Sequence, residues 1–283
     1  MTYGTIVVCG GGCYGGYYVR QLARARAAGA LTFERIVVVD RDADCAVARL
    51  ARAIEHDDAP SIAAHGWRLR RADAGDDDTP VLDAAYRHLP ITMLVSDWAP
   101  FFDRWLSAAI ASPVAASRDA VVPSPLMPHL LADWVAARVD RHRRRSTVVR
   151  VALSAIPDTP WQRSAPDLAH YASFATWMCP INCIEPPRCP ETRGPRDWTM
   201  PAAVRDAADR ASAQGTPYDV VALFHTTHRA YGVGMFDVSD ALSVDAALAA
   251  SDARTPLRIL VASVSHCHGA MAELLVGPPV TAA

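Results

Sequence analysis

The stretch Thr5-Ile-Val-Val-Cys-Gly10-Gly-Gly-Cys-Tyr-Gly15-Gly16 decides the fold of the amino-terminal half. A short run of apolar, β-favouring residues leads directly into Gly-x-Gly-x-x-Gly, and a helical pattern follows. A second apolar run, Arg35-Ile-Val-Val-Val39, ends in Asp40. This order of strand, glycine loop, helix, strand and acidic residue predicts the βαβ unit of a dinucleotide-binding fingerprint.

The same residues predict a site for a dinucleotide. We expect Gly10 to allow a tight turn, Gly12 to let the backbone approach a pyrophosphate, and Gly15 to let the helix pack closely on the strand. The amino terminus of the helix offers free N–H groups and the positive end of its dipole to the phosphates. The predicted cofactor-binding residues are Gly10, Gly11, Gly12, Cys13, Tyr14, Gly15, Asp40, Arg41 and Ser96.

The acidic residue bears on which cofactor binds. Asp40 is suited to accept hydrogen bonds from a ribose diol, and its charge repels a 2′-phosphate, so it favours NAD over NADP. Arg41 weakens that preference because it could turn to meet the phosphate. The methyltransferase fold also has a glycine loop after its first strand and an acid after its second. S-adenosylmethionine therefore stays open as an alternative ligand.

The composition is that of an ordinary globular protein. Half of the 283 residues are hydrophobic and the net charge is −2, which gives no electrostatic case for binding nucleic acid or an anionic membrane. No apolar run reaches the roughly 20 residues of a membrane span, and a strand that begins by Thr5 leaves no room for a signal peptide. We expect a cytoplasmic protein with a small-molecule substrate. A homo-oligomer is left open.

The absence of one residue type limits the chemistry. All 28 basic residues are arginine, so the chain cannot use a Schiff base, a P-loop lysine or the Tyr-x-x-x-Lys pair of short-chain dehydrogenases. Proton transfer must therefore use His, Asp, Glu, Cys, Tyr or water.

The pattern along the chain predicts two parts. Residues 1–155 alternate between strand and helix patterns, which predicts an α/β domain with a doubly wound, mainly parallel, Rossmann-like sheet. Residues 156–283 begin with a Cys- and Pro-rich insertion and continue as an α+β extension that provides the substrate- or metal-binding part. Within this second part we expect helices at 166–177, 201–213, 239–250 and 268–275, and strands at 218–224 and 257–264.

Three cysteines of the insertion predict a metal centre. Cys179, Cys183 and Cys189 lie within eleven residues, and two of them precede proline. Thiolates on a proline-stiffened loop suit an iron–sulfur cluster or zinc, although the C-x3-C-x5-C spacing is irregular for either. We expect Cys267 or a neighbouring histidine to complete the site. The alternative is a loop without metal, including one with a catalytic or redox-active thiol.

Histidines follow the two last predicted strands. His225-Thr-Thr-His228 follows one strand, and Ser265-His266-Cys267-His268 follows the other. Loops after parallel strands gather at one edge, so these side chains are expected beside the cofactor crevice. The predicted catalytic residues are His266, His268 and His225. The alternative for each single histidine is a hydrogen bond to the backbone.

Through Gly10, Gly12, Gly15 and Asp40, the first 155 residues resemble the Rossmann-type NAD(P)-binding superfamily. The outline of the chain is similar to saccharopine-dehydrogenase-like reductases. The resemblance implies that these residues bind NAD(P), and by analogy with that fold we expect an NAD(P)-dependent oxidoreductase that acts on a small molecule. The Cys-ligated metal expected from the cysteine spacing would polarise the substrate or pass electrons. A non-enzymatic nucleotide or redox sensor and an S-adenosylmethionine-dependent transferase are the alternatives.

Overall fold

The apolar runs on either side of the glycine loop form two neighbouring strands. Strands β1 (Thr2–Cys9) and β2 (Thr32–Asp40) pair in parallel, with Cys9 beside Val39, and helix α1 (Cys13–Ala27) connects them. The expected βαβ unit is therefore present. The computed structural model describes residues 1–56, 68–69, 81–82, 89–124, 130–144, 146–175, 183–252 and 254–278.

The first sheet continues on both sides of this unit. Its order is β11-β12-β6-β1-β2-β5, and the four strands from β6 to β5 are parallel. Strand β12 runs antiparallel to β6, and β11 runs antiparallel to β12. The added strands are β5 (Ile91–Val95), β6 (Ala120–Val122), β11 (Thr227–Ala230) and β12 (Val233–Asp237). Two strands from the carboxyl-terminal half thus complete the amino-terminal sheet.

The second sheet is built from the carboxyl-terminal half and has the order β10-β13-β14-β9-β8. Strands β10 and β13 are parallel, the other neighbours are antiparallel, and β7 also pairs with β14. Its strands are β7 (Val148–Val151), β8 (Trp161–Ser164), β9 (His170–Ser173), β10 (Val220–His225), β13 (Leu257–Val264) and β14 (His268–Val276). A separate short pair consists of β3 (Arg68–Leu69) and β4 (Val81–Leu82).

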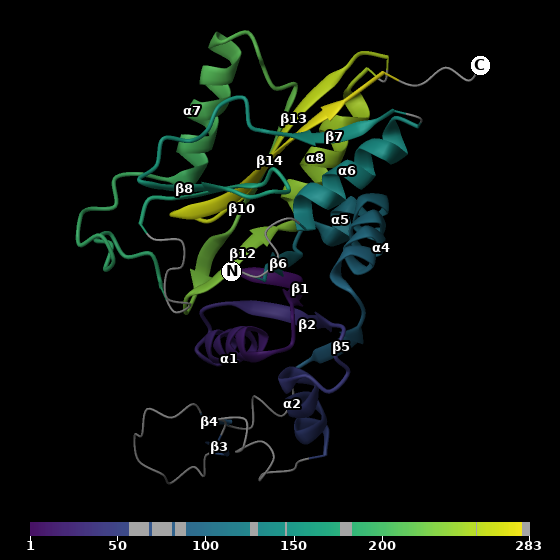
Figure 1. Cartoon of the computed structure of the whole chain (residues 1–283). Helices are drawn as coiled ribbons and strands as arrows, with labels where there is room; N and C mark the ends of the chain where they lie inside the picture. The colour runs from purple at the N-terminus through teal and green to yellow at the C-terminus, as the bar shows by residue number, and fades with distance from the viewer. Residues whose placement is uncertain are drawn as a thin grey trace.

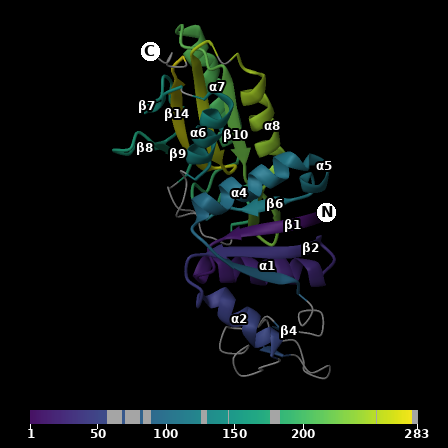
Figure 2. The same cartoon turned by 90° about the vertical axis from the view of Figure 1, so that its right-hand side faces the viewer.

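Seven helices in the described residues cover both sheets (Figures 1 and 2). Residues of α1 and α2 (Ala46–Glu55) pack on one face of the first sheet. Helices α4 (Trp98–Ala111), α6 (Leu130–His142) and α8 (Val238–Ala250) share one core with the other face and with the second sheet, and α7 (Met200–Ala213) packs on the far side of the second sheet. The short α5 (Pro113–Ala116) follows α4. The protein is thus a mixed α/β protein with two mixed sheets.

The residue alternation of the central strands explains these layers. In β1, Val7 and Cys9 belong to the core between the sheets, whereas Ile6 and Val8 face α1 and α2. Successive side chains of a strand point to opposite faces, so an uninterrupted apolar run suits a strand that is covered on both sides. No helix in the described ranges combines the length and the apolar character needed to span a bilayer.

Three secondary-structure predictions differ from the structure. Residues 268–276 form β14 rather than a helix, because pairing with β13, β9 and β7 outweighs the helix propensity of Ala, Met, Glu and Leu. Residues 170–173 form β9 in a hairpin with β8, where we expected the helix 166–177. In the first part of the chain the alternating pattern also predicts a helix at 80–88; residues 81–82 form β4, and the rest of that range lies outside the described residues.

A buried ion pair joins two helices between the sheets. Arg138 of α6 donates from Nε to Oδ1 of Asp245 of α8 at 2.6 Å, and His142 Nε2 lies 2.8 Å from the same oxygen. The side chains of Arg138 and Asp245 are only 9% and 8% exposed. Burial raises the pKa of Asp245, but the hydrogen bonds from Arg138 and His142 lower it further, so the net shift is downward.

We predict that Asp245→Asn lowers the free energy of unfolding by about 3–5 kcal/mol, because it leaves the Arg138 charge buried and unpaired. Urea unfolding at neutral pH measures this change. Asp44→Asn is the matched control, since Asp44 pairs with Arg49 and Arg52 at an exposed site and should have a far smaller effect. Because the pKa of Asp245 is lowered in the folded state, its contribution is present above its unfolded pKa and is lost as the pH falls. Equal effects of the two substitutions would contradict the prediction.

Candidate functional site

The glycine loop has the geometry that the sequence predicts. Gly10 has a φ of +92°, which favours glycine, and its N–H donates to the carbonyl of Val39 at 2.8 Å. A Cβ on Gly15 would overlap the carbonyl oxygen of Gly10, so the helix approaches the strand too closely for a side chain there. A Cβ on Gly12 would meet nothing within 4 Å. The loop therefore leaves no room for a side chain at Gly15, between strand and helix, whereas the space beside Gly12 is open.

Asp40 holds the loop from the next strand. Its Oδ2 accepts the N–H of Gly11 at 2.6 Å, and its Oδ1 accepts the N–H of Asp42 at 2.9 Å. An ionised carboxylate offers about four acceptor sites, so both oxygens can accept another hydrogen bond. Asp40 is half-buried and Arg41 is exposed. The carboxylate therefore lies beside the loop, as its predicted role requires.

The other predicted cofactor residues surround the same edge. Cys13 is exposed and Tyr14 half-buried in the first turn of α1. Ser96 follows β5, and its N–H donates to the carbonyl of Asp40 at 3.0 Å, while its hydroxyl donates to the carbonyl of Asp97. No side chain caps α1. The structure thus brings the predicted cofactor residues together where β1, β2 and β5 end.

The histidines gather at the ends of β10 and β13. These strands are parallel, with His225 beside Val264, so the segments that follow them start at one edge. His228 lies in β11, one residue beyond Thr227, and His266 and His268 flank Cys267 at the turn into β14. The spacing of His225 and His228 would suit one turn of a helix, but His225 ends β10 and His228 lies in β11.

The turn 265–268 is held by its own backbone and by a hydroxyl. The N–H of Ser265 donates to the carbonyl of His268 at 2.8 Å. Ser265 Oγ accepts the N–H groups of Cys267 and His268 at 3.2 and 3.3 Å, and lies 3.3 Å from His268 Nδ1. These contacts fix the directions in which the side chains of Cys267 and His268 point.

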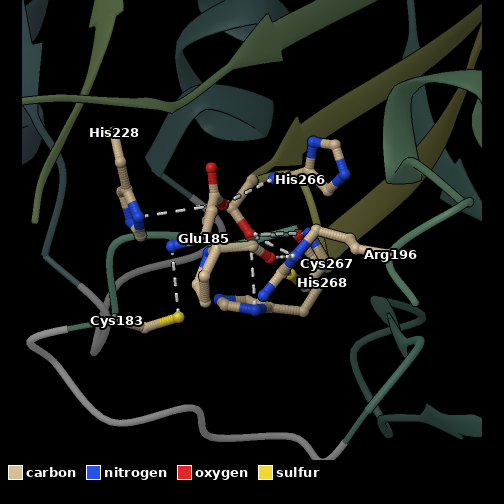
Figure 3. Close-up of polar contacts among 9 residues, drawn as sticks. Cys183, Glu185, Arg196, His228, His266, Cys267 and His268 are labelled. Carbon is tan, nitrogen blue, oxygen red and sulfur yellow. Dashed lines mark hydrogen bonds and ion pairs between the residues drawn. The ribbon is translucent and has the colours of Figure 1, made fainter. Parts of the chain in front are cut away.

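The segment 183–199 lies against this turn (Figure 3). Glu185 Oε1 accepts the N–H of His266 at 3.3 Å and lies 3.8 Å from His228 Nδ1. Arg196 contacts Cys267 Sγ through Nη1 and donates from Nε to the carbonyl of Pro186. Figure 3 shows the Glu185 carboxylate between His228 and the Arg196–Cys267 pair. We call Glu185, Arg196, His225, His228, His266 and His268 the histidine–arginine cluster.

The backbone of Glu185 supports a special role for this position. Its φ is +52°, in the left-handed region that non-glycine residues seldom adopt. Such a conformation costs on the order of 1–3 kcal/mol and is concentrated at functional sites. Its side chain is 15% exposed.

Burial controls the protonation of the cluster. It lowers the pKa of His228 to about 4, with further lowering by Arg196 and His266. It also lowers the pKa of His268 to about 4, with a smaller effect from His228, and it lowers that of His225. Burial raises the pKa of Glu185, and the charges of His266 and Arg196 oppose that rise. His228 and His268 are therefore neutral near pH 7.

Buried polar atoms without partners are concentrated here. Among the described residues, eleven buried side-chain N or O atoms have no hydrogen-bond partner, and six belong to the cluster or to adjoining β11. Unpaired buried polar atoms are rare and often mark bound water, an ion or a ligand. The six atoms are Arg196 Nη2, His225 Nε2, Thr227 Oγ1, His228 Nδ1, Arg229 Nε and His266 Nε2.

The predicted metal ligands are only partly described. Cys179 lies outside the described residues. Cys183 Sγ accepts the N–H of Glu185 at 3.4 Å, Cys189 is buried, and Cys267 faces Arg196. Burial raises the pKa of Cys189, but hydrogen bonds from Thr192 and Glu191 outweigh it and give a net lowering. Among the described residues no three His, Cys, Asp or Glu side chains converge on a metal position.

Two residues of the cluster escaped the sequence-based prediction. Glu185 and Arg196 lie in the Pro-rich segment, where no periodic pattern indicates which side chains turn inward. The available signal was the position of Glu185, two residues after a cysteine that was itself selected. His228 was noted beside His225 but was not selected as catalytic.

Strand register places the glycine loop and the cluster at one edge. Val8 of β1 pairs with Val122 of β6. Following the register of β12 and β11, in which Met235 pairs with Thr227, places Thr227 at the same height along the sheet as Val8. His228 is therefore level with Cys9, which directly precedes the loop. β6 and β12 lie between them, so the separation is about 14 Å, three strand spacings.

Comparison with known proteins identifies one family. Residues 131–277 match the family model AF_1314_C, described as "Uncharacterized protein, C-terminal domain". The chain belongs to this family. The match covers just over half of the chain and includes the whole cluster, but its description assigns no activity. No curated protein and no solved structure matches the chain.

We predict that His228 and His268 titrate in the folded protein near pH 4, well below the ordinary histidine value of about 6.5. The unfolded chain then binds more protons, so the free energy of unfolding decreases as the pH falls from about 6.5 towards 4, by on the order of 1–3 kcal/mol per imidazole. NMR of the imidazole resonances and urea unfolding at several pH values measure both effects. His228→Asn and His268→Asn should each flatten the pH dependence. An unchanged slope in both variants would contradict the burial argument.

Proposed function

We propose that this protein is an NAD(P)-dependent oxidoreductase that acts on a small molecule. The observation that carries the proposal is the glycine loop: it is closed by Gly10 and Gly15, is open above Gly12, and has Asp40 beside it at the end of β2. A dinucleotide uses this combination of an open glycine, a helix amino terminus and a neighbouring carboxylate to bring its pyrophosphate close to the backbone.

The strand order supports the same ligand. In chain order, the parallel strands β5-β2-β1-β6 are third, second, first and fourth among those of the first sheet. The Rossmann fold has this order, and it binds dinucleotides where the order reverses, which is here between β1 and β6. The glycine loop lies at that point. The Rossmann likeness is thus part of the proposal.

The direction of the sheet edge connects the dinucleotide to the cluster. In this proposal the adenosine ribose lies at Asp40, the pyrophosphate above Gly12, and the nicotinamide extends past β6 towards β12 and β11. That path ends near His228 and Glu185, which share the edge with the loop. When bound, the nicotinamide would donate or accept a hydride.

The chain's own residues would handle the accompanying proton. Glu185, whose pKa is raised by burial, is suited to hold a proton for transfer to or from a substrate oxygen. Neutral His228 and His268 are suited to donate a hydrogen bond to that oxygen rather than a proton. Among the predicted catalytic residues, His266 contributes its backbone N–H to Glu185, and His225 retains an unpartnered Nε2. We assign no step to a metal, and the cysteine centre stays a prediction.

We predict that Gly12→Ala reduces NADH affinity at least tenfold while leaving the fold intact. The added methyl group has open space in the protein alone, but it would occupy the position of the pyrophosphate. Calorimetry with NADH measures the affinity, and thermal unfolding checks the fold. Gly16→Ala is the matched control, because its Cβ would meet only the flexible end of Arg20 at 3.7 Å. Equal NADH affinity in the two variants would overturn the site, as would tighter binding of S-adenosylmethionine than of either dinucleotide.

A further prediction concerns the choice between cofactors. Asp40→Asn should reduce the preference for NADH over NADPH, because it removes the charge that repels a 2′-phosphate. The ratio of the two dissociation constants is the readout. Asp42→Asn is the control, since it removes the same charge from an exposed position two residues away. If the ratio changed equally in both variants, the preference for NADH would depend only on the overall negative charge near the loop and not on contact with Asp40.

A further inference from the structure

Arg196 is held rigidly beside the proposed reaction site. Its Nε donates to the carbonyl of Pro186 at 2.9 Å, and Nη1 contacts Cys267 Sγ. The guanidinium carbon lies 5.3 Å from the ring centre of Trp198, which stacks on Phe174 at 4.8 Å. These contacts fix the plane of the guanidinium, so little conformational freedom is lost when it binds a partner.

The third nitrogen of this guanidinium, Nη2, takes no part in these contacts. Nη2 is buried, and within the part of the chain that the structure describes it has no hydrogen-bond partner. It carries two N–H groups, one next to Nε and one next to Nη1, and both lie in the fixed plane. A buried donor without a partner costs about 1–3 kcal/mol, more when the group is charged. The position is therefore unfavourable unless something binds there.

The charge of Arg196 is also unbalanced within the described residues. Arg138 and Arg258 are paired with the buried carboxylates of Asp245 and Glu273. No described carboxylate lies within ion-pair distance of Arg196. Glu185 is the acid whose protonation Arg196 influences, but no ion pair joins them. Among the described residues, Arg196 is thus a fixed cation of the cluster that has no ion-pair partner.

The surroundings add positive charge and donors. In addition to burial, the charges of Arg229 and Arg205 lower the pKa of His225, and that of Arg196 lowers the pKa of His228. Arg229 itself is paired with Asp237 at 2.7 Å. The unpartnered imidazole nitrogens of His225, His228 and His266 belong to the same cluster. This environment opposes a cation and favours an anion with several acceptor oxygens.

We propose that the substrate of this site carries a carboxylate group that binds to Nη2 of Arg196. A planar carboxylate matches the fixed plane of the guanidinium, and charge-assisted hydrogen bonds of this kind are about twice as strong as neutral ones. The contact would place the rest of the substrate towards Glu185 and His228. This inference rests on the proposed oxidoreductase function and names the class of its substrate as small carboxylic acids.

The test uses acetate as the probe and the full chain without a dinucleotide. The indole N–H resonance of Trp198, assigned by its loss in Trp198→Phe, reports on the guanidinium that stacks against it. Titration with sodium acetate at constant ionic strength should shift this resonance in a saturable way, whereas acetamide and sodium chloride should not. Saturation by inorganic phosphate at lower concentration than acetate would overturn the carboxylate assignment.

Substitutions locate the contact. Arg196→Gln should weaken acetate binding at least tenfold, the equivalent of about 1.4 kcal/mol, and Arg196→Lys should restore it only in part because it lacks the planar donors. Arg205→Gln is the control, since it removes the same charge from an exposed residue of α7 that acts on His225. Unchanged acetate binding in Arg196→Gln would overturn the proposal. An ultraviolet thiolate band that disappears in Cys267→Ser would do so as well, because Cys267 would then be the anion that balances Arg196.

The same proteins separate this inference from the proposed function. NADH binding measured on each variant should be unchanged, because Arg196 does not touch the glycine loop in the proposed arrangement. Acetate binding without NADH binding would retain the anion site and refute the oxidoreductase. NADH binding without acetate binding would refute only the substrate class.

Discussion

The position of the candidate site depends on one backbone junction. Strand β10 ends at His225, and after Thr226 the chain enters β11, which belongs to the other sheet. The N–H of Thr226 donates to the carbonyl of Val264 at 2.8 Å, so this crossing point is itself fixed to β13. Because the two sheets share this junction, the edge where β13 ends continues into the edge where β1 and β6 end. The histidines that follow β10 and β13 therefore lie along the same edge as the glycine loop of the first sheet.

The sequence predicted the features that depend on local pattern. The βαβ unit follows from an apolar run, glycines at fixed spacing and Asp40, all within the first forty residues. The common edge of His225 and His266 followed from the rule for parallel strands. The sequence did not predict β14. A strand that is buried on both faces and rich in Ala, Met and Leu lacks the alternation of polar and apolar residues that would distinguish it from a helix. The sequence did not indicate Glu185 and Arg196 because their positions depend on contacts with residues of a turn that follows 81 and 71 residues later.

Two buried carboxylates illustrate how stability and candidate function differ in this protein. Glu273 is fully buried, yet it is bonded by Arg258, by Tyr218 at 2.7 Å and by the N–H and hydroxyl of Ser154. Glu185 is partly buried, has a left-handed backbone, and lies among side chains whose nitrogens lack partners. The first arrangement is satisfied and joins β13 and β14 to the segment that follows β7 and to the segment that precedes β10. The second is costly for folding, which is the condition expected where binding supplies the missing partners.

The turn 265–268 is attached to more than its own hairpin. The carbonyl of His266 accepts the N–H of Met200, the first residue of α7, at 2.8 Å, and the carbonyl of Cys267 accepts the N–H of Phe174 at 2.9 Å. A shift of this turn by more than a fraction of an ångström would break both bonds. The turn, the start of α7 and the end of β9 must therefore move as one body. A molecule bound at the cluster would change the mobility of α7 on the far face of the second sheet, at a distance from any atom that it touches.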